Sequence, residues 1–129
     1  MIERKISLAL GLALAASLAQ AAPNPSQVWV NVGKNNLGAS YDVDRVNAKR
    51  EGNLVTFALR VQYAPSEAAN GAGGFVALRQ GNCADRTYSD LHTDYMKKGA
   101  VLNSVGPDEK HTARGGSIAA IILDRICAQ

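Results

Sequence analysis

Two cysteines, Cys83 and Cys127, follow an N-terminal segment that has the layout of a secretion signal. This pair constrains the fold more than any other feature of the chain. Disulfides persist in oxidising compartments outside the cytoplasm, and two cysteines allow only one pairing. We therefore expect a Cys83–Cys127 disulfide, which would stabilise a small domain by about 4 kcal/mol in the chain-entropy model.

The alternative is that both cysteines are free thiols and that one of them is catalytic. A thiol nucleophile needs a base close to it in space. His92 and His111 are the only histidines, and no local pattern ties either of them to a cysteine. The structural disulfide is the favoured interpretation.

The signal-like segment has three zones in the order that export requires. Arg4 and Lys5 come first, an apolar run from 6 to 18 follows, and Ala19-Gln20-Ala21 supplies a small-x-small cleavage site. A buried helix of the mature protein is the alternative. We predict a signal peptide at 1–21 and one domain at 22–129, exported to the periplasm, or to the cell surface or medium. No cysteine for lipid attachment lies near the cleavage site, and no second apolar run could span a membrane.

The charge balance excludes one class of partner. The chain has 14 Lys and Arg against 11 Asp and Glu, a formal net charge of +3. Its basic residues are scattered, and only Lys49-Arg50 and Lys97-Lys98 are adjacent, apart from Arg4-Lys5 in the signal segment. Nucleic-acid binding requires a clustered basic surface, so we do not expect that function.

Alternating apolar residues predict a mostly β domain. Period-two patterns indicate about six strands, at 27–33, 39–44, 54–63, 75–80, 83–90 and 100–105. A helical period follows at 117–127, with Ile118, Ile122 and Ile126 on one broad apolar arc. The loop at 64–74 is the best candidate for disorder within the domain, because it has little to bury.

These elements predict an α+β domain, in which an antiparallel sheet is covered by the C-terminal helix. Cys127 in the last helical turn would fix the helix to the strand that holds Cys83. A small closed barrel with a terminal helix is the main alternative.

No catalytic or metal constellation stands out. His92 and Asp94 would share one side of a strand, but a zinc site usually needs three or four ligands. The glycines at 71–74 lack the Lys-Ser/Thr of a phosphate-binding loop. Asp42 and Asp44 share one side of a strand, which we interpret as ordinary exposed carboxylates. We therefore expect no enzyme activity, no metal and no cofactor.

Aromatic and basic residues could instead form an adhesive face. We expect the single tryptophan, Trp29, to be a core residue, with a binding surface as the alternative. The candidate binding residues mix the two side-chain types, and a solvated strand surface is their alternative interpretation; they are Arg79, Arg86, Tyr88, Tyr95, Lys97 and Lys98.

The order of landmarks resembles the surface-adhesin protein E family of Gram-negative bacteria. The segments that carry the resemblance are a Trp-containing strand, a Tyr-Asp strand, a polar turn, a Cys-x-x-Arg-Thr segment and a helix ending in cysteine, at 28–33, 41–44, 50–53, 83–87 and 126–127. The tryptophan that many members carry before the final helix is absent from 103–107. Only Cys83 and Cys127 are carried over, as structural residues.

The resemblance implies a sheet with a helix tethered by this disulfide. It also implies bacterial adhesion through a protein partner, such as the host matrix and serum proteins laminin, vitronectin or plasminogen. The alternative function is inhibition of an extracellular enzyme such as lysozyme. The oligomeric state does not follow from the sequence.

Overall fold

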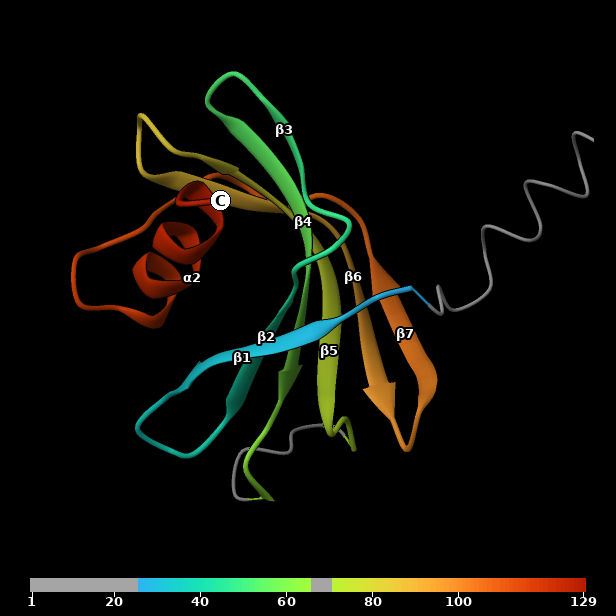
Figure 1. Ribbon diagram of the computed structural model, residues 1–129. Helices are drawn as coiled ribbons and strands as arrows, with labels where there is room; N and C mark the ends of the chain where they lie inside the picture. The colour runs from blue at the N-terminus through green and yellow to red at the C-terminus, as the bar shows by residue number, and fades with distance from the viewer. Residues whose placement is uncertain (1–25, 66–70) are drawn as a thin grey trace, which may run out of the picture.

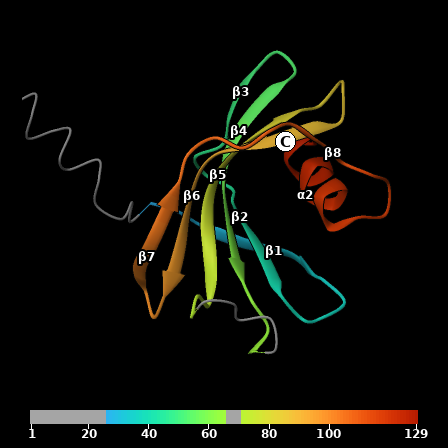
Figure 2. The ribbon, with the colours of Figure 1, turned by 180° about the vertical axis from the view of Figure 1, so that it is seen from behind.

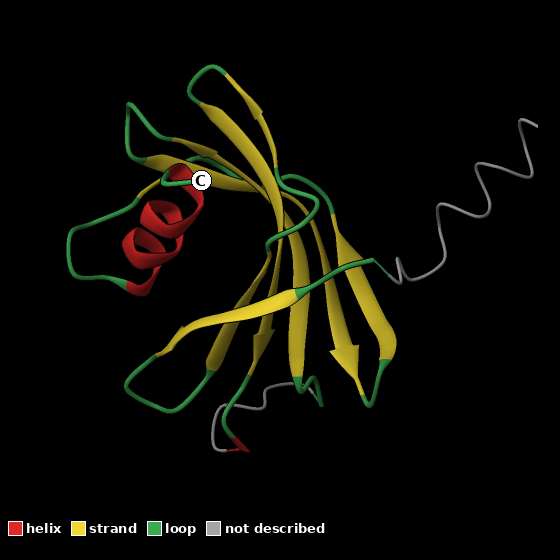
Figure 3. Ribbon diagram, in the orientation of Figure 1, coloured by secondary structure: helices red, strands yellow, loops and turns green. Residues whose placement is uncertain are grey.

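The computed structural model describes residues 26–65 and 71–129. The expected signal peptide at 1–21 and the centre of the expected soft loop, 66–70, lie outside the described residues. The described part contains a sheet of eight strands and the C-terminal helix (Figures 1 and 3). In chain order the elements are β1 (Trp29–Lys34), β2 (Ser40–Asp44), β3 (Lys49–Glu51), β4 (Leu54–Gln62), β5 (Gly74–Asn82), β6 (Thr87–Lys97), β7 (Ala100–Val105), β8 (His111–Thr112) and α2 (Ile118–Cys127).

The strands pair antiparallel in the order β1-β2-β4-β5-β6-β7, with β3 added to β4 and β8 added to β6. The sheet curves around α2, which lies on its concave side (Figures 1 and 2). Strands β1 and β7 stand at the two ends of this order and do not pair, so the sheet is open. The α+β prediction is confirmed, and the closed-barrel alternative is not observed.

The turn between β5 and β6 differs from the expectation. β5 continues through Gly81 and Asn82, and the expected strand at 83–90 begins only at Thr87. The Asn82 side-chain oxygen accepts hydrogen bonds from the N–H groups of Ala84 and Asp85, at 2.9 Å each. This local bonding turns the backbone immediately after Asn82, as Asn side chains often do. Cys83 therefore lies in a hairpin turn and not in a strand.

The core lies between β4 and α2. Alternate β4 residues Val55, Phe57, Leu59 and Val61 are at most 2% exposed. They face the buried helix residues Ala120, Ile122, Leu123 and Ile126, with Val32, Val43 and Ala113 completing the cluster. Each large apolar side chain buried in this way contributes about 1.5–3 kcal/mol relative to an exposed one.

Gly81 allows the helix to approach the sheet closely. A Cβ atom at this position would lie only 2.5 Å from Leu123 Cδ1 and 3.4 Å from Val55 Cγ2. Real Cβ atoms do not come so close to a neighbour, so any other residue at 81 would displace the helix or the strand. The glycine is needed here for space and not for a special backbone conformation.

Capping fixes the start of α2. Ser117 has extended backbone angles, and its Oγ accepts a hydrogen bond from the Ala120 N–H at 3.1 Å, which is the usual geometry of a serine N-cap.

Three contacts fix the end of α2. The Cys83–Cys127 disulfide joins it to the β5–β6 turn across 44 positions, as predicted. Arg50 Nη1 donates to the Cys127 carbonyl oxygen at 2.9 Å, and Arg86 forms an ion pair with Asp124. The helix end is therefore tied to the β3–β4 hairpin and to the β5–β6 hairpin.

Candidate binding surface

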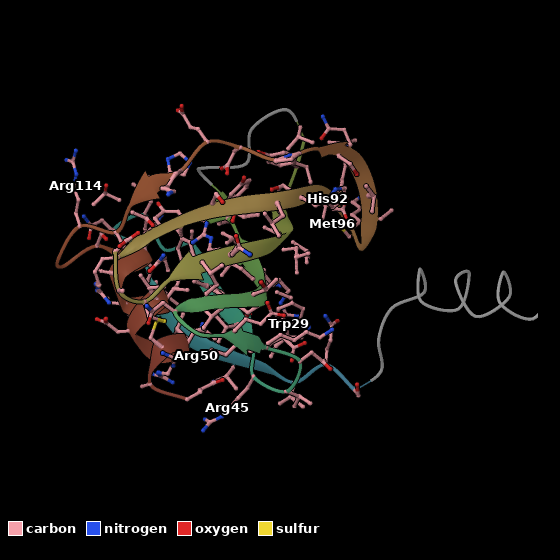
Figure 4. All side chains as sticks on the ribbon, turned by 90° about the horizontal axis from the view of Figure 1, so that it is seen from above. Trp29, Arg45, Arg50, His92, Met96 and Arg114 are labelled. Atoms are coloured by element: carbon pink, nitrogen blue, oxygen red, sulfur yellow. A yellow bond between two sulfur atoms is a disulfide. The ribbon has the colours of Figure 1, made fainter. Side chains whose placement is uncertain are left out.

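The side of the sheet that faces away from α2 carries the candidate site. Successive residues of a strand point to opposite sides, so Thr56, Ala58 and Arg60 of β4 lie opposite the buried Phe57 and Leu59. Residues paired across neighbouring antiparallel strands share a side of the sheet. We call this side the outer face, and Figure 4 shows Trp29, His92 and Met96 on it, away from the helix.

One row of paired residues crosses all six main strands of the outer face. From β1 to β7 it consists of Asn31, Asp42, Arg60, Val76, Asp94 and Ser104. Hydrogen bonds join three neighbouring pairs: Asn31 to Asp42 at 3.0 Å, Arg60 to Asp42 at 2.9 Å, and Ser104 to Asp94 at 2.5 Å. The row therefore has bonded polar groups on both sides of Val76.

Arg60 is held by two neighbours. Its Nε and Nη2 donate to Asp42 Oδ2 at 3.2 and 2.9 Å, and its guanidinium lies 4.7 Å from the centre of the Trp29 ring. A cation in this position is attracted by the aromatic face, and the carboxylate fixes its direction. Trp29 is half-buried and does not belong to the core cluster, so its expected core role was wrong. The period-two pattern placed Trp29 opposite the valines, but the position of the helix decides which side becomes the core.

Asp42 and Asp44 are not exposed carboxylates, contrary to the expectation. Asp42 is 6% exposed and bonds to Arg60 and Asn31, whereas Asp44 is completely buried. Asp44 Oδ1 accepts from the N–H groups of Val28 and Val46 at 3.3 and 3.0 Å, and Oδ2 accepts from Asn47 Nδ2 at 2.7 Å. Their roles are thus to orient Arg60 and to hold the turn after β2.

The environment of Asp44 has two opposing effects on its protonation. Burial by itself raises the pKa, because it disfavours the charged form. The hydrogen bonds from the Asn47 side chain and from the backbone N–H groups of Val46, Val28 and Asn47 favour the charged form. These bonds prevail and hold the pKa of Asp44 below its ordinary value of 3.8.

His92 and Asp94 share one side of β6, as expected, with His92 Nε2 2.7 Å from Asp94 Oδ1. The hydrogen bond from Ser104 has the largest effect and lowers the pKa of Asp94. Burial opposes it, and the hydrogen bond and charge of His92 lower the pKa further, so that the pKa lies below its ordinary value. Residues 26–65 and 71–129 contain no group of three or more His, Cys, Asp or Glu side chains that could hold a metal ion. The pair instead supplies polar groups to the outer face beside Leu78 and Val76.

Apolar side chains of the outer face extend from β5 to the β6–β7 turn. Leu78 is paired with Ala58 and His92, and Met96 is paired with Val101. Leu78 and Val101 are 43% and 55% exposed.

A hollow of about 370 Å³ opens at one end of this area, lined in part by Arg60, Gln62, Gly74, Val76, Met96 and Lys98. Gly74 stands between Gln62 and Met96 in the pairing and contributes no side chain. A Cβ atom there would lie 2.0 Å from the Val61 carbonyl oxygen, so the position requires glycine.

Comparison with known proteins identifies the family. The model of the family described as surface-adhesin protein E matches residues 29–128. The chain belongs to the surface-adhesin protein E family. No curated protein and no solved structure matches it.

Membership in the surface-adhesin protein E family confirms the resemblance seen in the sequence. It makes this chain an adhesin-like surface or exported protein that binds other proteins. Within the described residues, no helix is both long and apolar enough to cross a membrane.

The six candidate binding residues of this surface-adhesin protein E domain fall into two groups. The first group lies toward the α2 end of the sheet. Arg79 is paired with Asp90 at 2.7 Å and lies 4.4 Å from the centre of the Tyr88 ring, while Arg86 is bonded to Asp124. These arginines are oriented by other residues of the same domain.

The second group lies at the far end of β6. Tyr95 packs against Phe75 with 5.9 Å between ring centres, and Lys97 and Lys98 are exposed beside the β6–β7 turn. Tyr88 and Lys97 are about 30 Å apart along the strand, at roughly 3.3 Å per residue. The sequence pattern missed Arg60 and Met96, which only the pairing of β4, β5 and β6 brings together.

Proposed function

We propose that this protein is a non-enzymatic, exported adhesin that attaches to a host matrix or serum protein through the outer face of its sheet. The apolar area of that face carries the proposal; it consists of the exposed Leu78 and Val101 and the half-buried Met96, and Arg60 is fixed at its border. Protein interfaces commonly combine an apolar centre with a polar rim, and they are enriched in Trp, Met and Arg. The outer face contains residues of these kinds, and the polar side chains of His92, Asp94 and Gln62 lie next to its apolar ones.

The rigidity of the face supports the same conclusion. Arg60 is already bonded to Asp42 and covers Trp29, so a partner does not need to immobilise this side chain on binding. Ordering a long, flexible side chain costs about 0.5–1.5 kcal/mol, and an interface that is fixed in advance avoids this cost. The hollow above Gly74 offers a place for one projecting side chain of the partner.

The test is a surface-resonance measurement against immobilised laminin, vitronectin and plasminogen. The informative variant is Leu78→Lys, and Ile121→Lys on the solvent side of α2 is its matched control, since the two native side chains are 43% and 44% exposed. We expect Leu78→Lys to weaken binding at least about tenfold, as at a desolvated interface centre, and Ile121→Lys to leave it unchanged. Binding to none of the three proteins, or equal loss in both variants, would reject the proposal.

The location of the protein is tested by protease shaving of intact cells. Attachment to a host protein requires the domain to be outside the cell, so shaving should remove it. A protein that becomes accessible only after the outer membrane is opened would reject host attachment and leave a periplasmic binding protein.

A further inference from the structure

The hollow beside Gly74 has a positive lining. Arg60 and Lys98 both line it, and none of its lining residues in the described part of the chain is an Asp or a Glu. Its volume of about 370 Å³ is sufficient for a small chemical group, since such sites measure about 300–1,000 Å³. The charge of the lining therefore favours an anion over a cation.

Arg60 keeps unused hydrogen-bond donors. A guanidinium carries five N–H groups, and among the described residues those of Arg60 bond to one acceptor, Asp42 Oδ2, through Nε and Nη2. Asp42 and the Trp29 ring hold the guanidinium in place, so the remaining N–H groups of Nη1 have a fixed direction. Arginine forms strong, charge-assisted hydrogen bonds with carboxylates. A second carboxylate is therefore the best complement to Nη1.

Lys98 is fixed at its backbone, and its ammonium group is exposed. Lys98 and Gly99 have φ angles of 50° and 81°, and the flanking Lys97 and Ala100 are paired. Two consecutive residues with positive φ between paired strands are typical of a type I′ hairpin turn. None of the ion pairs within residues 26–65 and 71–129 involves Lys98. Because Asp42 already balances Arg60, Lys98 supplies the net charge of the hollow.

The lining between the two cations is apolar. Arg60 is paired with Val76 of β5, and Met96 of β6 comes two residues before Lys98. Val76 and Met96 are half-buried, and Gly74, the partner of Met96 in the pairing, adds no side chain. A group that fits this lining has a negative charge on a short apolar stem.

We propose that the hollow binds a glutamate side chain of the host protein partner. Its carboxylate would lie between Arg60 and Lys98, and its methylene groups would lie against Val76 and Met96. The inference rests on the proposed function, because it names the group that a partner on the outer face inserts. An aspartate has a shorter stem, and a basic side chain would meet like charge.

The test is an NMR titration of the isotope-labelled protein with short peptides, without any matrix protein. The probes are blocked Leu-Glu-Leu, blocked Leu-Gln-Leu, which has the same shape but no charge, and Leu-Leu with a free terminal carboxylate. We expect Leu-Glu-Leu to shift the amide signals of Gly73, Gly74 and Gly99 until they saturate. It should bind at least about fivefold more tightly than Leu-Gln-Leu, because only its carboxylate forms charge-assisted bonds.

Lys98→Asn removes the charge and keeps the turn, because Asn-Gly is a preferred pair in type I′ turns. We expect this variant to bind Leu-Glu-Leu at least about threefold more weakly and Leu-Gln-Leu as wild type does. The matched control is Lys49→Gln, which removes the same charge from β3. Lys49 is paired with Thr56, about 20 Å along β4 from Gln62 at roughly 3.3 Å per residue, so the control should bind both peptides as wild type does.

Equal affinities for Leu-Glu-Leu and Leu-Gln-Leu, signal shifts away from the hollow, or an unchanged affinity in Lys98→Asn would overturn the proposal. Preference for Leu-Leu over Leu-Glu-Leu would also overturn it, because the ligand would then be a chain terminus. If the protein binds a matrix protein but none of the peptides, only the glutamate site is rejected. If it binds Leu-Glu-Leu but no matrix protein, only host attachment is rejected.

Discussion

The half of the sheet beneath α2 and the half formed by β6 and β7 share the same antiparallel pairing. They differ in how deeply their side chains are buried. Beneath the helix, Phe57 and Leu59 are at most 1% exposed, and covalent, ionic and hydrogen-bond contacts fix the helix end. Along β7, every residue is exposed. The difference separates two parts of a small domain: one half contains the core and its cross-links, and the other leaves its end strand exposed.

Removal of the Cys83–Cys127 disulfide should have the largest effect on the difference between the two halves. Cys127→Ser should destabilise the domain by about 4 kcal/mol, because the unfolded chain regains the freedom of a 44-residue loop. For a domain of this size that corresponds to a fall in melting temperature of roughly 15–30 °C. Thermal melts of wild type with and without reductant should reproduce the loss. Equal melting temperatures with and without reductant would show that the disulfide does not stabilise the helix-covered half.

The close packing of the helix gives the next largest effect. Gly81→Val should lower the free energy of unfolding by about 1–3 kcal/mol, because the added side chain overpacks against Leu123. Gly106→Val is the control, because a Cβ at Gly106 would meet nothing within 4 Å. Urea unfolding of the two variants measures the contrast. Similar losses in both would mean that the fit between helix and sheet is loose.

The buried carboxylate of Asp44 predicts a pH dependence. Because its pKa is lower in the folded protein than in the unfolded chain, its charged form stabilises the fold at neutral pH. This contribution is complete above the unfolded pKa of about 3.9, and it disappears as the pH falls through the lower folded value. Asp44→Asn should therefore lower the free energy of unfolding by about 1–3 kcal/mol at pH 7, because it weakens buried hydrogen bonds.

Urea unfolding of wild type and Asp44→Asn between pH 7 and pH 2 provides the measurement. We expect the difference in unfolding free energy between them to narrow below pH 4. A constant difference over this range would contradict the role assigned to the charge.

The smallest effect on the unfolding free energy is expected in the half formed by β6 and β7. Leu102→Thr on β7 should change the unfolding free energy by less than about 0.5 kcal/mol, because an exposed side chain has little packing to lose. The measurement is urea unfolding of wild type and the variant. A cost comparable to that of Gly81→Val would show that the free edge also contributes to the core.

The sequence allowed the disulfide, the helix and the strand at β4 to be predicted, because each has a local signal. Alternating Val55, Phe57 and Leu59 define a half-buried strand, and Ser117 begins a helical period. The turn at Cys83 was missed because the capping bond from Asn82 is a side-chain effect that strand periodicity does not detect.

The outer face could not be predicted in the same way. Arg60 lies 18 positions from Asp42, and it is the pairing of β2 with β4 that brings them together. Whether Trp29 enters the core depends on where α2 packs, which the period of β1 does not encode. Residues that are adjacent only through strand register carry no local pattern.

The bridge between Cys83 and Cys127 also changes what a cut in the chain would do. Arg114, labelled in Figure 4, lies in the exposed segment before α2 and offers trypsin-like proteases an accessible bond. Cleavage there would separate the polypeptide into two pieces, yet the helix would stay in place because the disulfide holds it to the β5–β6 turn. The nicked molecule would run as one band on a denaturing gel until a reductant released the terminal fragment.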